Sequence, residues 1–318
     1  MKILLAADAA CHSRQAADLL KTFPFASRKT EVIVLAIVPT DAYSERPTRL
    51  LVQAGLRRQA ENLARGQAAH LQDFGWTAQA VLREGLVAQS IIEAAEEFEA
   101  DLVVMGSQES GARRGHLRSV SQQVLRYAPC SVLVARPERD DWPPHGSEQG
   151  NRFRILVAYD GSREARAAVE TLASVPFQAG TEITILTVLP LIKHFRTDIL
   201  QQTSPEWPGR QQAARHSLET VADMLRPTTP CIRVKLREGT DVSAEILKMA
   251  DELDTDIIIV GHKEKNRIQR FLLGSVSKRI MRRARCSVWM LSAERRSKST
   301  TPDVPLGEYF PDSIDRAS

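Results

Sequence analysis

The segment LLGSVS, residues 272–277, has the residue types of a helix start that binds phosphate. Ser275 stands where a helix is expected to begin, and a helix start offers unpaired N–H groups and the positive end of the helix dipole. Gly274 would give a ligand access, and the hydroxyls of Ser275 and Ser277 would add hydrogen-bond donors. Glycine and serine are also common at helix starts that bind nothing, so a plain capped helix remains the alternative.

Three further residues are predicted at the carboxyl ends of strands that would share one edge of a sheet. Asp160 follows the strand pattern RILVAY, and its carboxylate can accept hydrogen bonds from ribose hydroxyls. Val188 can offer its backbone to a purine edge, and Gly261 ends the segment DIIIVG without a side chain that would keep a ligand away. Together with the helix start, these residues predict a crevice shaped for ATP. Taken alone, an aspartate at this position is more often a turn or helix-cap residue than a ligand contact.

The elements that would position these residues occur twice in the chain. Asp8 corresponds to Asp160 and Cys130 to Cys286, so the offset between the copies grows only from 152 (160 − 8) to 156 (286 − 130). So slow a drift indicates a duplicated domain rather than chance similarity. The matching segments are residues 2–20 with 154–172, 82–109 with 236–264, and 119–135 with 275–291.

Each half alternates short apolar runs with amphipathic segments in the order β-α-β-α-β-α-β-α-β. Strands separated by helices must run parallel, because each crossover returns the chain to the same end of the sheet. The predicted fold class is α/β, with two tandem, doubly wound, parallel five-stranded domains of the Rossmann type, which bind ligands where the strand order reverses. The expected parts are a first domain at 1–136, a linker at 137–152, a second domain at 153–293 and a mobile tail at 294–318.

The last strand of each half, CSVLVA or CSVWML, is apolar and would form an exposed edge in an isolated domain. Exposed strand edges pair readily. The two halves are therefore expected to join through these strands into a pseudo-twofold dimer within one chain, while association into a homodimer stays open.

The spacing of the phosphate segment resembles the signature of the universal stress protein family. That signature runs Gly, two residues, Gly, nine residues, Gly, then Ser or Thr; here Gly261, Glu264, Gly274 and Ser275 occupy these positions. The segments VAYDGS, REG and ARCSV are also similar to the family, and the resemblance covers both halves. It implies a tandem universal stress protein with the adenine nucleotide alpha hydrolase-like fold. The family's ATP-binding members imply adenine and ribose contacts at Asp160 and Val188, and phosphate contacts at Gly261, Gly274, Ser275 and Val276.

Both halves depart from the family pattern at the middle glycine. Glu264 places a carboxylate where the family has a glycine whose backbone meets phosphate, and like charge there is unfavourable. Four basic residues surround it and would neutralise it or bind phosphate themselves. The first half carries Glu109 at the equivalent position and Arg118 in place of the third glycine, so we expect it to be degenerate as a nucleotide site, although Gly106 is kept. The basic residues around Glu264 are Lys263, Lys265, Arg267 and Arg270.

Other functional classes find little support in the sequence. The chain has 43% hydrophobic residues but no apolar run long enough to cross a bilayer and no signal segment, so we expect a cytoplasmic protein that does not contact membranes. Neither catalytic residues nor a metal site are expected, because no catalytic motif or metal-ligand spacing is present. The basic strip at 278–285 contains no aromatic residue for base stacking, so a solvated helix face is preferred to a nucleic-acid surface. The cysteines are far apart and are expected to be reduced thiols: Cys11, Cys130, Cys231 and Cys286.

We therefore expect a stress-response regulatory protein that binds ATP, with Mg²⁺, or a related adenine nucleotide in its second domain, and that acts on a protein partner. One alternative is an interaction scaffold without nucleotide, because both halves carry glutamate in place of the middle glycine. Another is a slow ATP hydrolase. A sensor fits better than an enzyme, because no base is evidently paired with a nucleophile.

Overall fold

The computed structural model describes residues 1–8, 11–22, 30–40, 49–107, 119–136, 153–175, 177, 180–191, 205–229, 231–262 and 274–292. Strands and helices alternate through both halves, as the apolar and amphipathic patterns predicted. The first half contains β1 (Lys2–Ala7), α1 (Cys11–Thr22), β2 (Glu31–Pro39), α2 (Arg49–Asp73), β3 (Thr77–Gly85), α3 (Val87–Glu97), β4 (Leu102–Gly106), α4 (Ser119–Tyr127) and β5 (Ser131–Ala135). The second contains β6 (Arg154–Ala158), α5 (Arg163–Ala173), β7 (Glu182–Pro190), α7 (Trp207–Leu225), β8 (Cys231–Gly239), α8 (Val242–Glu252), β9 (Ile257–His262), α9 (Ser275–Arg283) and β10 (Ser287–Ser292).

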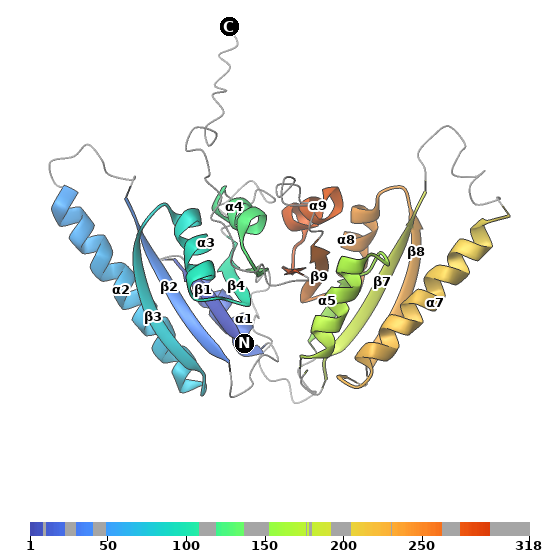
Figure 1. Cartoon of the computed structure of the whole chain (residues 1–318), viewed down its shortest axis with the longest axis horizontal. Coiled ribbons are helices and arrows are strands. Elements are labelled where there is room, and N and C mark those ends of the chain that lie inside the picture. The colour runs from blue at the N-terminus through green and yellow to red at the C-terminus, as the bar shows by residue number, and fades with distance from the viewer. Residues whose placement is uncertain are drawn as a thin grey trace, which may run out of the picture.

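The strands form one ten-stranded sheet in the order β3-β2-β1-β4-β5-β10-β9-β6-β7-β8. Strands within each half run parallel, and the order reverses between β1 and β4 and again between β6 and β9. The two halves lie side by side, with α2 and α7 at the outer ends (Figure 1). The predicted doubly wound α/β fold is confirmed.

The helices cover the two faces of the sheet in two layers. Apolar residues of α1, α2, α5 and α7 pack on one face in a core that runs through both halves, and those of α3, α4, α8 and α9 pack on the other. Helix α5 illustrates the local cause: its buried residues recur at helical spacing, so one stripe of the helix is apolar. They are Ala165, Ala168, Val169 and Leu172.

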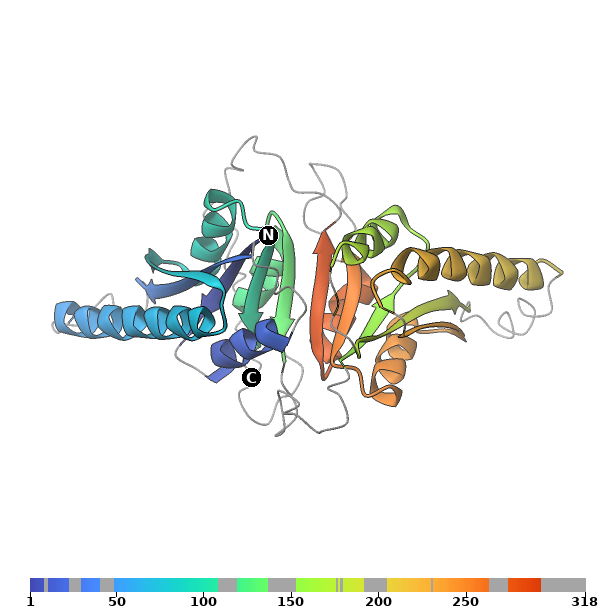
Figure 2. The same cartoon turned by 90° about the horizontal axis from the view of Figure 1, so that it is seen from below.

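The halves meet where β5 pairs antiparallel with β10, side by side at the centre of Figure 2. Trp289, which is 2% exposed, lies opposite Leu133 in this register. Two hydrogen bonds at equivalent positions of the repeat lie at the ends of this strand pair. The Arg136 N–H donates to Ser287 Oγ (3.1 Å), and the Ser292 N–H donates to Ser131 Oγ (3.2 Å). The predicted pairing of the halves through their last strands is confirmed.

Two of the predicted segments, the linker at 137–152 and the tail at 294–318, lie outside the described residues. None of the helices in the described part of the chain is both long and apolar enough to cross a membrane.

Candidate functional site

Three of the residues predicted to hold a ligand, Asp160, Val188 and Gly261, lie where the strand order of the second half reverses. In the sheet register, Ala158 of β6 lies beside Val260 of β9 on one side and Leu186 of β7 on the other. Continued two residues further, these registers bring Asp160 level with Val188 and with the end of β9. This is the edge at which open α/β sheets bind ligands.

Asp160 shapes the turn between β6 and α5. Its Oδ1 accepts a hydrogen bond from the Ser162 N–H (3.0 Å), and Gly161 between them has a φ of 77°, which favours glycine. Ser162 then caps the helix, because its Oγ accepts from the Ala165 N–H (3.1 Å). The carboxylate of Asp160 is exposed at the sheet edge. Asp160 therefore has a structural role in the turn and remains accessible to a ligand.

Val188 turns its backbone toward the same place. The Tyr159 N–H donates to the Leu186 carbonyl (2.9 Å), so the main-chain groups of Leu186, in β7, point toward β6. Alternate residues of a strand point to the same side, and β6 ends at Ala158. The main-chain groups of Val188 consequently face the space beyond the end of β6, while its side chain is half-buried against the core.

The start of α9 is left without a side-chain cap. Gly274 is its N-cap residue, with φ of −54° and ψ of 147°, and the first turn holds no acidic residue. The Lys278 N–H bonds to the Gly274 carbonyl (2.9 Å), so the first-turn N–H groups of the next three residues have no acceptor within the helix. These are Ser275, which is exposed, and Val276 and Ser277, which are half-buried. By contrast, Ser162 caps α5 and Asp241 caps α8.

An ion pair fixes α9 against the start of α8. The Arg279 guanidinium donates to Asp241 Oδ2 and to Ser243 Oγ (3.3 Å). The hydrogen bond from Ser243 Oγ (2.6 Å) is the main cause that lowers the pKa of Asp241, and Arg279 lowers it further. The repeat alignment places Leu86 and Gln123 at these positions in the first half, where no such ion pair can form. The sequence interpretation missed this pair, although a difference between the copies marked both positions.

Gly261 has a packing role that the sequence did not reveal. A Cβ atom at this position would lie 2.9 Å from the Cα and backbone N of Ala165 in α5. The space left by its missing side chain is therefore filled by the first turn of that helix. At Gly274, in contrast, the nearest atom to such a Cβ is Ser277 Oγ at 3.9 Å, so the space is open.

The altered part of the phosphate segment lies outside the described residues. This applies to Glu264 and its basic neighbours at 263–270, and to Glu109 and Arg118 in the first half. The described part of the chain contains no group of three His, Cys, Asp or Glu residues that could hold a metal ion.

Comparison with known proteins identifies the family. The model of the universal stress protein family matches residues 1–136 and matches again at residues 151–292. The chain belongs to the universal stress protein family. Because the match occurs twice, the chain is a tandem universal stress protein.

Relatives and solved structures agree with this family. A Staphylococcus haemolyticus protein that carries the universal stress protein name is 26% identical over 156 residues, which are 49% of this chain and 93% of the relative. A universal stress protein structure from Archaeoglobus fulgidus has a TM-score of 0.68 at 21% identity, covering 92% of this chain and 98% of that one. A Pseudomonas aeruginosa structure with the family name has a TM-score of 0.61 at 15% identity, covering 92% of each chain. These structures share the fold across both halves.

Proposed function

We propose that this tandem universal stress protein is a stress-response regulator that binds ATP or a related adenine nucleotide in its second half. The observation that carries the proposal is the uncapped start of α9, which follows β9 at the point where the strand order reverses. A helix start of this kind attracts phosphate through its N–H groups and its dipole.

Five of the predicted residues would contact the nucleotide in the proposed complex. The triphosphate would accept hydrogen bonds from the first turn of α9, at the backbone of Ser275, Val276 and Ser277 and at the serine hydroxyls. The carboxylate of Asp160 would accept hydrogen bonds from the ribose, and the backbone of Val188 would contact the purine. Mg²⁺ would arrive with the triphosphate, whose charge it neutralises.

The first half is proposed to bind no nucleotide. It lacks the third glycine of the family pattern, where Arg118 stands, and it lacks the arginine that ties α9 to α8. The nucleotide would then bind only in the second half, and the first half would serve as its structural support.

A matched pair of glycine substitutions tests the proposal. Gly274→Ala adds a methyl group in open space at the phosphate-binding N–H groups, so the fold should persist while the Kd for ATP rises at least about tenfold in calorimetry. Gly66→Ala in α2, also in open space, is the control and should leave the Kd unchanged. If the wild-type chain neither binds added ATP nor releases a nucleotide on denaturation, the interaction scaffold becomes the better interpretation.

A further inference from the structure

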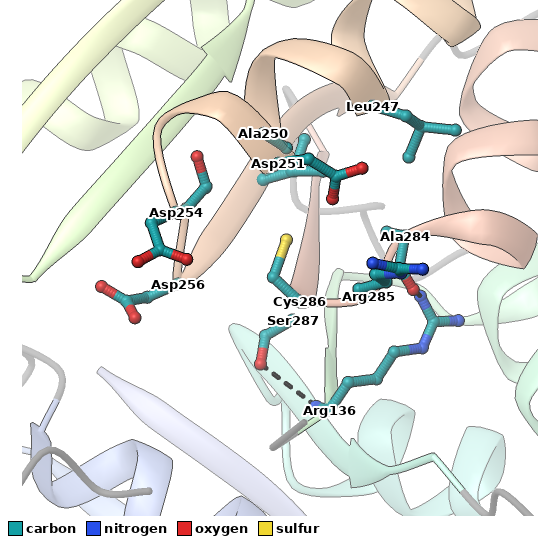
Figure 3. Close-up of a pocket in the computed structure, with 12 residues that line it drawn as sticks. Arg136, Leu247, Ala250, Asp251, Asp254, Asp256, Ala284, Arg285, Cys286 and Ser287 are labelled. Carbon is teal, nitrogen blue, oxygen red and sulfur yellow. Dashed lines mark hydrogen bonds between the residues drawn. The ribbon is translucent and has the colours of Figure 1, made fainter. Parts of the chain in front are cut away.

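A cavity lies on the opposite edge of the sheet from the candidate nucleotide site. It has a volume of about 220 Å³ and is bordered by α8, the end of α9, the first residues of β9 and β10, and Arg136 from the first half. The amino ends of the parallel strands β9 and β10 meet at this edge, whereas Gly261 lies at the other end of β9. Figure 3 shows its charged side chains around Cys286 and Ser287.

Several charged groups of the cavity wall are engaged in holding the structure together. The Arg136 guanidinium donates to the main-chain carbonyls of Met281 and Ala284 at the end of α9, the latter at 3.1 Å. Asp256 Oδ2 accepts from the Arg154 N–H (2.8 Å), and Asp254 Oδ2 pairs with the Arg154 guanidinium (3.1 Å). These groups explain the shape of the cavity and need no ligand.

Three other polar groups of the wall have no such role. Asp251 and Arg285 are exposed, and neither forms an ion pair with any described residue. Thr255 is only 8% exposed, yet its Oγ1 has no hydrogen-bond partner among the described residues. A buried hydroxyl without a partner is destabilising, so an apolar side chain of similar shape should be tolerated at this position.

The duplicated half shows that packing alone does not require these groups. In the repeat alignment, Thr255 corresponds to Ala100, and Arg285 corresponds to Pro129. Ala100 is 2% exposed at the same place in the fold, so an apolar side chain satisfies that position. The second half therefore has a hydroxyl and a guanidinium that the first half lacks, beside a carboxylate that both halves carry, Asp251 here and Glu96 in the first half.

We propose that this cavity is a ligand site for a compact zwitterion of the α-amino acid class. Asp251 would bind the ammonium group and Arg285 the carboxylate. The volume is below the roughly 300–1,000 Å³ typical of drug-sized ligands, which favours a molecule as small as an amino acid. The Cys286 thiol also lines the cavity, and burial raises its pKa to about 12, so it adds no charge.

Thermal unfolding of the full chain, followed by calorimetry, tests this site. The proteinogenic α-amino acids are added singly at millimolar concentration, and for any that raises Tm the matching amine and carboxylic acid are tested alone. The expected result is that at least one amino acid binds while neither half-molecule does. A failure of every amino acid would overturn the proposal. An equal rise in Tm with sodium sulfate would also overturn it, because it would indicate an anion site at Arg285. An equal rise in Tm with the amine alone would overturn it as well, because it would indicate a cation site at the aspartates.

Substitutions then assign the binding to the cavity. Asp251→Asn and Arg285→Gln should each weaken the Kd of that amino acid about tenfold or more. The controls Glu96→Gln, at the matching position of the first half, and Arg282→Gln, on the exposed face of α9, should leave it unchanged. Thr255→Val should keep or raise the Tm of the unliganded protein, because it removes a buried hydroxyl that has no partner among the described residues. If Asp251→Asn and Arg285→Gln leave the Kd unchanged, or if the controls weaken binding equally, the assignment to this cavity is wrong.

Discussion

Arg136, at the end of the first half, donates a hydrogen bond to the main-chain carbonyl of Ala284 in the second half, at a distance of 3.1 Å. A second donor of the same guanidinium reaches the Met281 carbonyl. Met281 lies in the last turn of α9 and Ala284 is its C-cap residue, so the arginine caps the end of the helix and complements its dipole. The helix that begins at the candidate nucleotide site is thus held at its far end by the other domain.

Arg136→Ala should therefore destabilise the protein. The side chain is buried, and its loss leaves two helix-end carbonyls without their charged donor, so we expect the free energy of unfolding to fall by about 2 kcal/mol. Denaturant unfolding measures this, and hydrogen exchange should show faster exchange in the last turn of α9. Ser292→Ala, at the matching position of the second half, is the control. It keeps the N–H that donates to Ser131, so its effect should be small.

Asp241→Asn should loosen the start of α9 in a pH-dependent way. The substitution weakens the cap of α8 and removes the ion pair with Arg279, with an expected cost of about 1 kcal/mol at neutral pH. The pKa of Asp241 is lowered below its ordinary value of 3.8, so its contribution is present above that pH and is lost as the pH falls through the lowered value. Denaturant unfolding of wild type and variant at a series of pH values should show that the difference in their free energies of unfolding becomes smaller at acidic pH. If that difference stays the same at acidic pH, the charge of Asp241 does not contribute to the stability of the protein.

The two glycines at the candidate site should differ in how strongly their replacement by alanine changes the stability of the protein. Gly261→Ala places a Cβ atom 2.9 Å from the backbone of α5, so we expect a loss of about 1–3 kcal/mol. Gly274→Ala has open space and a φ of −54° that alanine adopts readily, so its effect on stability should lie within about 0.5 kcal/mol. The Tm values of both variants check this contrast. Equal destabilisation would mean that α5 does not pack on β9 as described.

Cys286 should be a poorly reactive thiol. Burial raises its pKa to about 12, and the nearby Arg136 only partly opposes that shift. The thiolate that reacts with iodoacetamide is therefore scarce at about pH 8 in the folded protein. Peptide mapping after alkylation should find Cys286 labelled slowly in the native chain and quickly in denaturant. Fast labelling of the native protein would contradict this environment.

The fold could be predicted from the sequence because its signals are local and repeated. The alternation of apolar runs with amphipathic segments predicts the order of strands and helices, and the internal repeat predicts two domains. Element boundaries are harder to predict: α7 begins at Trp207 with Pro208 in its first turn, although Pro205 is also of a type that favours a helix start. A proline favours the first turn of a helix without specifying which of two nearby prolines occupies it.

The candidate site was only partly predictable. Asp160 and Val188 could be assigned to one edge because parallel strands end together. The packing role of Gly261 was hidden, because the approach of α5 depends on tertiary structure. The contacts of Arg136 and Arg279 were hidden for the same reason: each side chain reaches an element distant in sequence.

The number of ATP molecules bound per chain tests the central proposal most directly. Calorimetric titration of ATP into the full chain should give one site, which Gly274→Ala weakens while Gly66→Ala leaves it intact. Two equivalent sites per chain, or one site that Gly274→Ala does not affect, would contradict the assignment of the nucleotide to the start of α9.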